Sequence, residues 1–99
     1  MKFTCTTEEK EKVLATYFKD GYLFQRPSKL NKMFIAVYCI ALSLDKKVYT
    51  ESELNDALKK KCDNYVEMRR YLVDYQFLSR DRYGKEYTVN HDVINATIE

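Results

Sequence analysis

Basic side chains gather in one stretch in the second half of the chain, where they could bind an anion. The stretch carries Arg69, Arg70, Arg80, Arg82 and Lys85. Guanidinium groups donate hydrogen bonds in a fixed fork that fits phosphates and the edge of a guanine base. Residues 59–87 hold eight basic and five acidic side chains, whereas the whole chain has a net charge of only +2. That total is too small to indicate a nucleic-acid partner by itself, so the placement of the charge has to be explained.

Catalytic chemistry is poorly supported by the nucleophiles and bases present. His91 is the only histidine, so a histidine-rich metal site is excluded and only one imidazole base is available. Cys39 stands among apolar residues and is expected in the core. Cys62 follows three lysines that could lower its pKa, although an exposed thiol without a role is the more common interpretation. We therefore predict no enzyme, no cofactor and no metal site.

Composition places the chain among globular proteins. It has 99 residues, of which 45% are hydrophobic and 32% charged, and this predicts one domain over residues 1–99. Three cysteines without CxxC spacing favour a reduced, cytoplasmic protein. The apolar run 33–44 is shorter than the roughly 20 residues that a bilayer-spanning helix needs, so we expect no membrane partner.

The first helix is expected within residues 1–21. Thr6 and Glu9 have the spacing of a capping box, and Gly21 suits the left-handed residue that ends many helices. Apolar residues at helical spacing form one stripe: Val13, Leu14, Tyr17 and Phe18. This stripe is expected to cover a second helix, which makes it an N-terminal addition to the rest of the domain.

The second helix is expected from a cap at Ser28 to Asp45, and it has two apolar faces. The face expected in the core consists of Leu30, Met33, Phe34, Val37, Ala41 and Leu44. The other face consists of Ile35, Cys39 and Leu42. A helix that is apolar on two faces is normally buried on both, here by the first helix or by a dimer partner.

The second half of the chain alternates between helical and extended patterns. An extended piece over 47–49 precedes a helix capped by Thr50 and Glu53, with Leu54, Ala57 and Leu58 facing inward. A further helix is expected over 64–75 with Asp63 as its cap. Strands over 77–82 and 85–89 follow, joined at Tyr83-Gly84. The tail 90–99 has no clear pattern. This order predicts an α+β fold, namely a winged helix-turn-helix core over 28–89 with an extra N-terminal helix.

The same region resembles the bacterial domain of unknown function 2087. Three segments carry the resemblance: "YTESELN" (49–55), "DNYVEMRRYLVDYQFLSRD" (63–81) and "YGKEY" (83–87). It covers roughly residues 22–89, and Gln76 stands where members often carry glycine. Members are often attached to helix-turn-helix regulators, so the resemblance implies a role near transcription. It implies no enzymatic activity.

The two adjacent arginines are predicted to differ in role. On a helix over 64–75, Arg69 falls within the apolar arc, so its stem should be packed and its head paired with an acid. Arg70 falls outside the arc, together with Glu67 and Asp74. It is either a solvated residue held by these acids or a contact to phosphate or guanine. The acids argue against a helix set deep in a DNA groove.

The predicted function is DNA binding, as a transcriptional regulator or an accessory of one. The residues expected to contact double-stranded DNA are Asn64, Arg70, Tyr71, Arg80, Arg82, Tyr83 and Lys85. Alternation should place Arg80 and Arg82 on one face of the hairpin, away from Phe77, Ser79 and Asp81, where they could contact phosphate or the minor groove. An ordinary charged hairpin is the competing interpretation. The alternative function is a winged-helix interaction or dimerisation module, in a homodimer or with a partner regulator.

Overall fold

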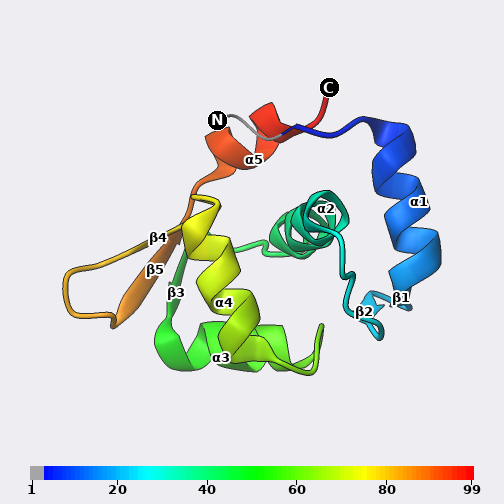
Figure 1. Cartoon of the computed structure of the whole chain (residues 1–99). Coiled ribbons are helices and arrows are strands. Elements are labelled where there is room, and N and C mark those ends of the chain that lie inside the picture. Colours follow the sequence, from blue (N-terminus) through cyan, green and yellow to red (C-terminus); the bar gives the residue numbers. More distant parts are fainter. Residues whose placement is uncertain (1–3) are drawn as a thin grey trace.

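Helix α2 (Leu30–Leu42) lies at the centre of the structure, a computed structural model that describes residues 4–99. Figure 1 views α2 nearly along its axis, between α1 (Thr7–Tyr17) and α4 (Tyr65–Asp74). Eight of its residues are buried: Met33, Phe34, Ile35, Ala36, Val37, Tyr38, Ile40 and Ala41. The predicted burial of α2 on two faces is therefore confirmed, because its apolar residues surround the helix axis.

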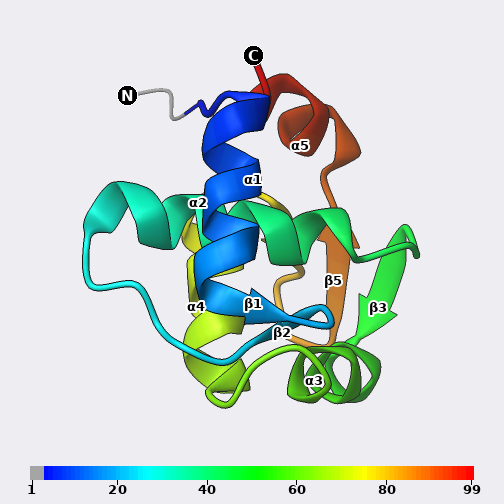
Figure 2. The same cartoon turned by 90° about the vertical axis from the view of Figure 1, so that its right-hand side faces the viewer.

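The two ends of α2 differ from the prediction. Lys29 rather than Ser28 is the N-cap residue, and its side chain makes no capping hydrogen bond. Leu30, expected in the core, is 67% exposed, because the first turns of α2 project beyond α1 (Figure 2). Leu42, expected on the second buried face, is also exposed, and α2 ends there rather than at Asp45. Core packing therefore covers the middle of α2 and leaves its ends open.

Helix α1 begins as predicted but ends earlier. The Glu9 N–H donates to Thr6 Oγ1 (3.1 Å) and the Thr6 N–H donates to Glu9 Oε1 (2.9 Å), which confirms the capping box. Phe18, expected in the helix, lies in β1 (Phe18–Lys19), which pairs antiparallel with β2 (Tyr22–Leu23). Asp20 and Gly21 join these strands with φ values of 52° and 81°. Gly21 therefore belongs to a hairpin turn, where two successive positive φ values are needed, rather than to a helix stop.

Helix α1 packs against α2 and buries Val13, so the predicted cover of the second face of α2 is supplied within the chain. Ile35 is fully buried on that face and Cys39 is half-buried. Leu14 is 39% exposed, so the stripe on α1 is narrower than predicted. The tail forms α5 (His91–Thr97), whose end lies beside the N-terminal segment: the Cys5 N–H donates to the Thr97 carbonyl (3.0 Å).

Strand β3 (Val48–Thr50) leads directly into α3 (Glu51–Lys59). The predicted capping box is confirmed, because Thr50 Oγ1 accepts from the Glu53 N–H and the Glu53 carboxylate accepts from the Thr50 N–H. Helix α4 follows after a turn, and Asn64 rather than Asp63 caps it by accepting from the Glu67 N–H (3.1 Å). Asp63 instead accepts a hydrogen bond from the Tyr22 hydroxyl.

The chain then forms β4 (Leu78–Arg80) and β5 (Glu86–Val89), which complete an antiparallel sheet of order β3-β5-β4. The reversal after α4 occurs at Gln76, with a φ of 66°. The turn needs a left-handed backbone conformation at this position, which glycine adopts at lower cost than glutamine. Strand β4 is shorter than predicted, and Phe77 and Leu78 are both buried. The predicted alternation of side chains over 77–82 fails, because β4 spans only Leu78–Arg80 and Phe77 precedes it.

One core joins these elements. Helix α4 packs on α2, and Val37, Leu72, Phe77 and Leu78 are each at most 1% exposed, as predicted for a shared core. The Phe34 and Phe77 rings lie within this core with centroids 5.8 Å apart. The prediction of an α+β fold is confirmed. Figure 1 shows the β4–β5 hairpin extending away from this core beside α3 and α4.

Candidate nucleic-acid interface

A groove of about 540 Å³ separates α4 from the β4–β5 hairpin. Its lining comes from α4, from the hairpin and from the start of α3: Glu51, Asn64, Val66, Glu67, Arg69, Arg70, Val73, Asp74, Arg80 and Tyr87. Three arginines and three carboxylates face it, so the lining has no net charge. How each charged group is paired therefore decides what the groove can bind.

Arg69 ties α4 to α3. Its Nη1 donates to Asn55 Oδ1 (2.6 Å) and lies 3.2 Å from Glu51 Oε1, and its guanidinium is 6.0 Å from the centre of the Tyr87 ring. The Arg69 side chain is only 20% exposed. The predicted packing and pairing with an acid are confirmed. Arg69 is therefore committed to holding the groove walls together.

Arg70 points into solvent. Its side chain is 83% exposed, and its ion pair among the described residues is a long contact of 3.8 Å between Nε and Asp74 Oδ2. The other acid expected to hold it, Glu67, is engaged elsewhere: Arg26 Nε donates to Glu67 Oε1 at 2.7 Å. An exposed pair of this length contributes little stability. Arg70 is therefore available to a ligand at small cost.

Tyr71 faces away from the groove. Its hydroxyl accepts a hydrogen bond from Arg26 Nη2 (2.9 Å), and its ring stacks on Tyr75 with centroids 6.2 Å apart. Because Arg26 also binds Glu67, the loop before α2 covers this side of α4. The same bonds raise the pKa of Arg26, with the Glu67 hydrogen bond as the largest cause.

The hairpin is held in shape by Asp81. Its Oδ1 accepts from the N–H groups of Lys85 (2.7 Å) and Glu86 (3.2 Å), and these bonds lower the pKa of the Asp81 carboxyl. Gly84 has a φ of 68°, and an added Cβ would lie 2.6 Å from Arg80 Nη2. Glycine therefore suits the positive φ of the turn, and the end of the flexible Arg80 side chain lies across it.

The end of the hairpin carries exposed cations around an exposed aromatic ring. Tyr83 is 74% exposed, and Arg82 and Lys85 are also exposed. Within residues 4–99, neither of these cations nor Arg80 lies within 4.0 Å of a carboxylate in an ion pair. Lys85 also lines a second depression against α3. These groups can therefore approach an anion without first breaking an ion pair.

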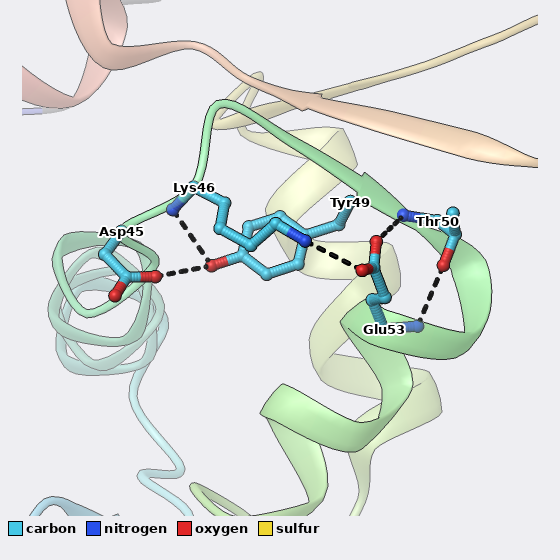
Figure 3. A network of polar contacts seen from close by, with 5 residues as sticks. All are labelled: Asp45, Lys46, Tyr49, Thr50 and Glu53. Atoms are coloured by element: carbon cyan, nitrogen blue, oxygen red, sulfur yellow. Dashed lines mark hydrogen bonds and ion pairs between the residues drawn. The ribbon is translucent and has the colours of Figure 1, made fainter.

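A polar network fixes the start of α3 beside the groove (Figure 3). The buried Tyr49 hydroxyl donates to Asp45 Oδ1 and accepts from the Lys46 N–H, both at 3.2 Å. Lys46 Nζ donates to Glu53 Oε2 (2.8 Å). The Lys46 and Thr50 hydrogen bonds lower the pKa of Glu53 to about 2. Glu51, the partner of Arg69, begins the same helix.

The structure brings only part of the predicted set together. Asn64, Arg70 and Arg80 line one groove, whereas Arg82, Tyr83 and Lys85 lie at or near the hairpin end and Tyr71 lies on another side of α4. Sequence reasoning missed Val66 and Arg26. At helical spacing Val66 shares a side of α4 with Val73, and this second apolar side, next to Arg69, was the available signal. The partnership of Arg26 with α4 had no local signal.

The prediction that Cys62 is exposed is wrong. Expected as an exposed thiol with a pKa that three lysines could lower, it is 4% exposed, and burial raises its pKa to about 11. Its thiol donates to the Leu58 carbonyl (3.5 Å), and Leu23 bridges to its backbone. Burial also raises the pKa of Cys39, to about 12. Within the described residues 4–99 there is no cluster of three His, Cys, Asp or Glu that could hold a metal ion.

Comparison with known proteins gives one match. Residues 22–89 match the model of the family DUF2087, described as an uncharacterized protein conserved in bacteria. No curated protein and no solved structure matches the chain significantly. Over residues 4–99, the helices are too short or too polar to cross a membrane.

Proposed function

We propose that this chain, which belongs to the bacterial DUF2087 family, is a DNA-binding protein with a winged helix-turn-helix core. The proposed core comprises residues 28–89 of a single domain, with α1 as an N-terminal addition and α5 as a tail. Helix α4 is the recognition helix and the β4–β5 hairpin is the wing. The biological role is that of a transcriptional regulator or an accessory of one, in the cytoplasm.

The sheet order carries this proposal. A winged helix has a first strand that pairs with the last, and two helices between that strand and the hairpin. The order β3-β5-β4, with α3 and α4 following β3, has this form. The groove beside the hairpin supports a DNA-facing role for this side, as do the three hairpin cations, which make no ion pair within residues 4–99.

The acids of α4, which argued against DNA contact, are largely offset by neighbouring cations. Arg26 binds Glu67 with two nitrogens, and Asp74 is close to Arg70. A phosphate approaching α4 would therefore meet paired charges rather than bare carboxylates. The net attraction is small, so we expect weak binding by one chain, and a dimer or an attached regulator would be needed for tight binding.

Fluorescence anisotropy with random duplex DNA across a salt series tests the proposal. Each phosphate contact contributes about 0.9 to the slope of log affinity against log salt concentration. Arg82→Ala and Lys85→Ala should each weaken binding to all sequences and lower the slope by about that amount. Lys19→Ala is the matched control, because Lys19 is exposed in β1, on the other side of α2 from the hairpin.

A folded protein that binds no duplex at low salt would refute DNA binding. The alternative is an interaction module, favoured by one observation: the three carboxylates in the groove balance its three arginines. Sedimentation velocity of the chain over a concentration series would then test for a homodimer.

A further inference from the structure

Val66 is an apolar side chain exposed on the outer side of α4. It is 50% exposed, whereas Met68 and Leu72 on the inner side are at most 2% exposed. It lines the groove together with Asn64 and Arg70, and it is the second residue of the helix. Val66 is not among the residues that pack against the core, so burial in the folded chain does not explain an aliphatic side chain at this position. We therefore ask what ligand this side chain could contact.

The position of Val66 is the one from which a recognition helix reads bases. Residues at the N-terminal end of such a helix contact base edges in the major groove. A β-branched side chain in a helix keeps one strongly preferred rotamer, so the two methyl groups of Val66 are held in place before a ligand arrives. They would meet a base edge without loss of side-chain entropy.

The neighbouring polar groups limit what this end of α4 can recognise. The Glu67 carboxylate is bound by two nitrogens of Arg26, so its charge is offset and it is a weaker acceptor for a cytosine amino group. Asn64 Oδ1 accepts from the Glu67 N–H. The exposed aliphatic side chain that lines the groove at this end is that of Val66. Among the bases, thymine alone presents a methyl group in the major groove.

We infer that Val66 is a specificity-determining residue that contacts the 5-methyl group of a thymine. The inference rests on the proposed DNA-binding function and adds to it the class of base pair read at the start of α4. Arg70, one turn further along α4, would lie over the neighbouring base pairs or their phosphates.

Replacement of thymine by deoxyuridine removes that methyl group alone and leaves base pairing intact. Duplexes selected from a random pool for binding are amplified with either thymidine or deoxyuridine triphosphate, and the affinity of the protein for the two forms is compared. The wild-type protein should bind the deoxyuridine form about fourfold more weakly, the factor expected for one buried methyl-sized group. In the Val66→Ala variant, whose side chain is shorter, the ratio between the two forms should fall towards one.

Val48→Ala is the matched control, because Val48 is also a half-exposed valine, lies in β3 and does not line the groove. This variant should keep the wild-type ratio. Equal binding of the two forms by the wild-type protein would overturn the inference and leave DNA binding standing. An unchanged ratio in the Val66→Ala variant would also overturn it, since the effect would then come from DNA shape. Failure to bind either form would refute DNA binding and the inference together.

Discussion

Replacement of Arg69 by alanine should destabilise the protein much more than the same change at Arg70. Arg69→Ala removes the 2.6 Å bond to Asn55, the 3.2 Å contact with Glu51 and the packing of a side chain that is 20% exposed. A hydrogen bond to a charged group contributes about 1.5–3 kcal/mol. The pair with the half-exposed Glu51 adds at most about 1 kcal/mol. We therefore expect a loss of about 2–3 kcal/mol in the free energy of unfolding.

Arg70→Ala is the control, because it makes the same chemical change one residue away. Its side chain is 83% exposed and its ion pair is long, so the loss should be about 0–1 kcal/mol. Thermal unfolding at neutral pH measures both variants, and a domain of this size loses about 4–8 °C of Tm per kcal/mol. Equal losses, or a larger loss at Arg70, would show that the network around Arg69 does not stabilise the contact between α3 and α4.

Three further outcomes are expected. Leu72→Ala, at a position with 0% exposure, should cost about 2–5 kcal/mol in denaturant unfolding; under 1 kcal/mol would mean that the core is misplaced. Glu53, with its pKa lowered to about 2, should contribute stability above pH about 4.5 that is lost as the pH falls towards 2, so Glu53→Gln should flatten the fall of Tm with acid in this window. Cys62, with its pKa raised to about 11, should react with an aromatic disulfide reagent at pH 8 far more slowly in the folded than in the unfolded protein.

Local sequence signals determined where several elements begin and which helix faces are buried. The two capping boxes, Thr6–Glu9 and Thr50–Glu53, involve residues three apart, so the hydrogen bonds that form them are encoded locally. The inward position of Arg69 also follows from spacing, because helical periodicity fixes which residues share a side. The family match over 22–89 agrees with the residues that suggested it.

The tertiary structure decided every feature that depends on residues far apart in the chain. Arg26 binds α4 across 41 residues, and this contact holds the Tyr71 hydroxyl and occupies Glu67. Phe18 has a helical pattern, but pairing with Leu23 places it in a strand. Cys62 follows three charged residues, yet the packing of Leu23 and α4 around it buries its thiol.

The physical reason is the range over which each interaction is encoded. Capping and periodicity act within one or two helical turns, so a short segment contains both partners. Exposure and ion pairing depend on which surfaces meet, and those contacts exist only after the core has formed around α2. The sequence alone therefore determined the elements and their order, whereas the fold decided which arginines are committed to structure and which remain available to bind.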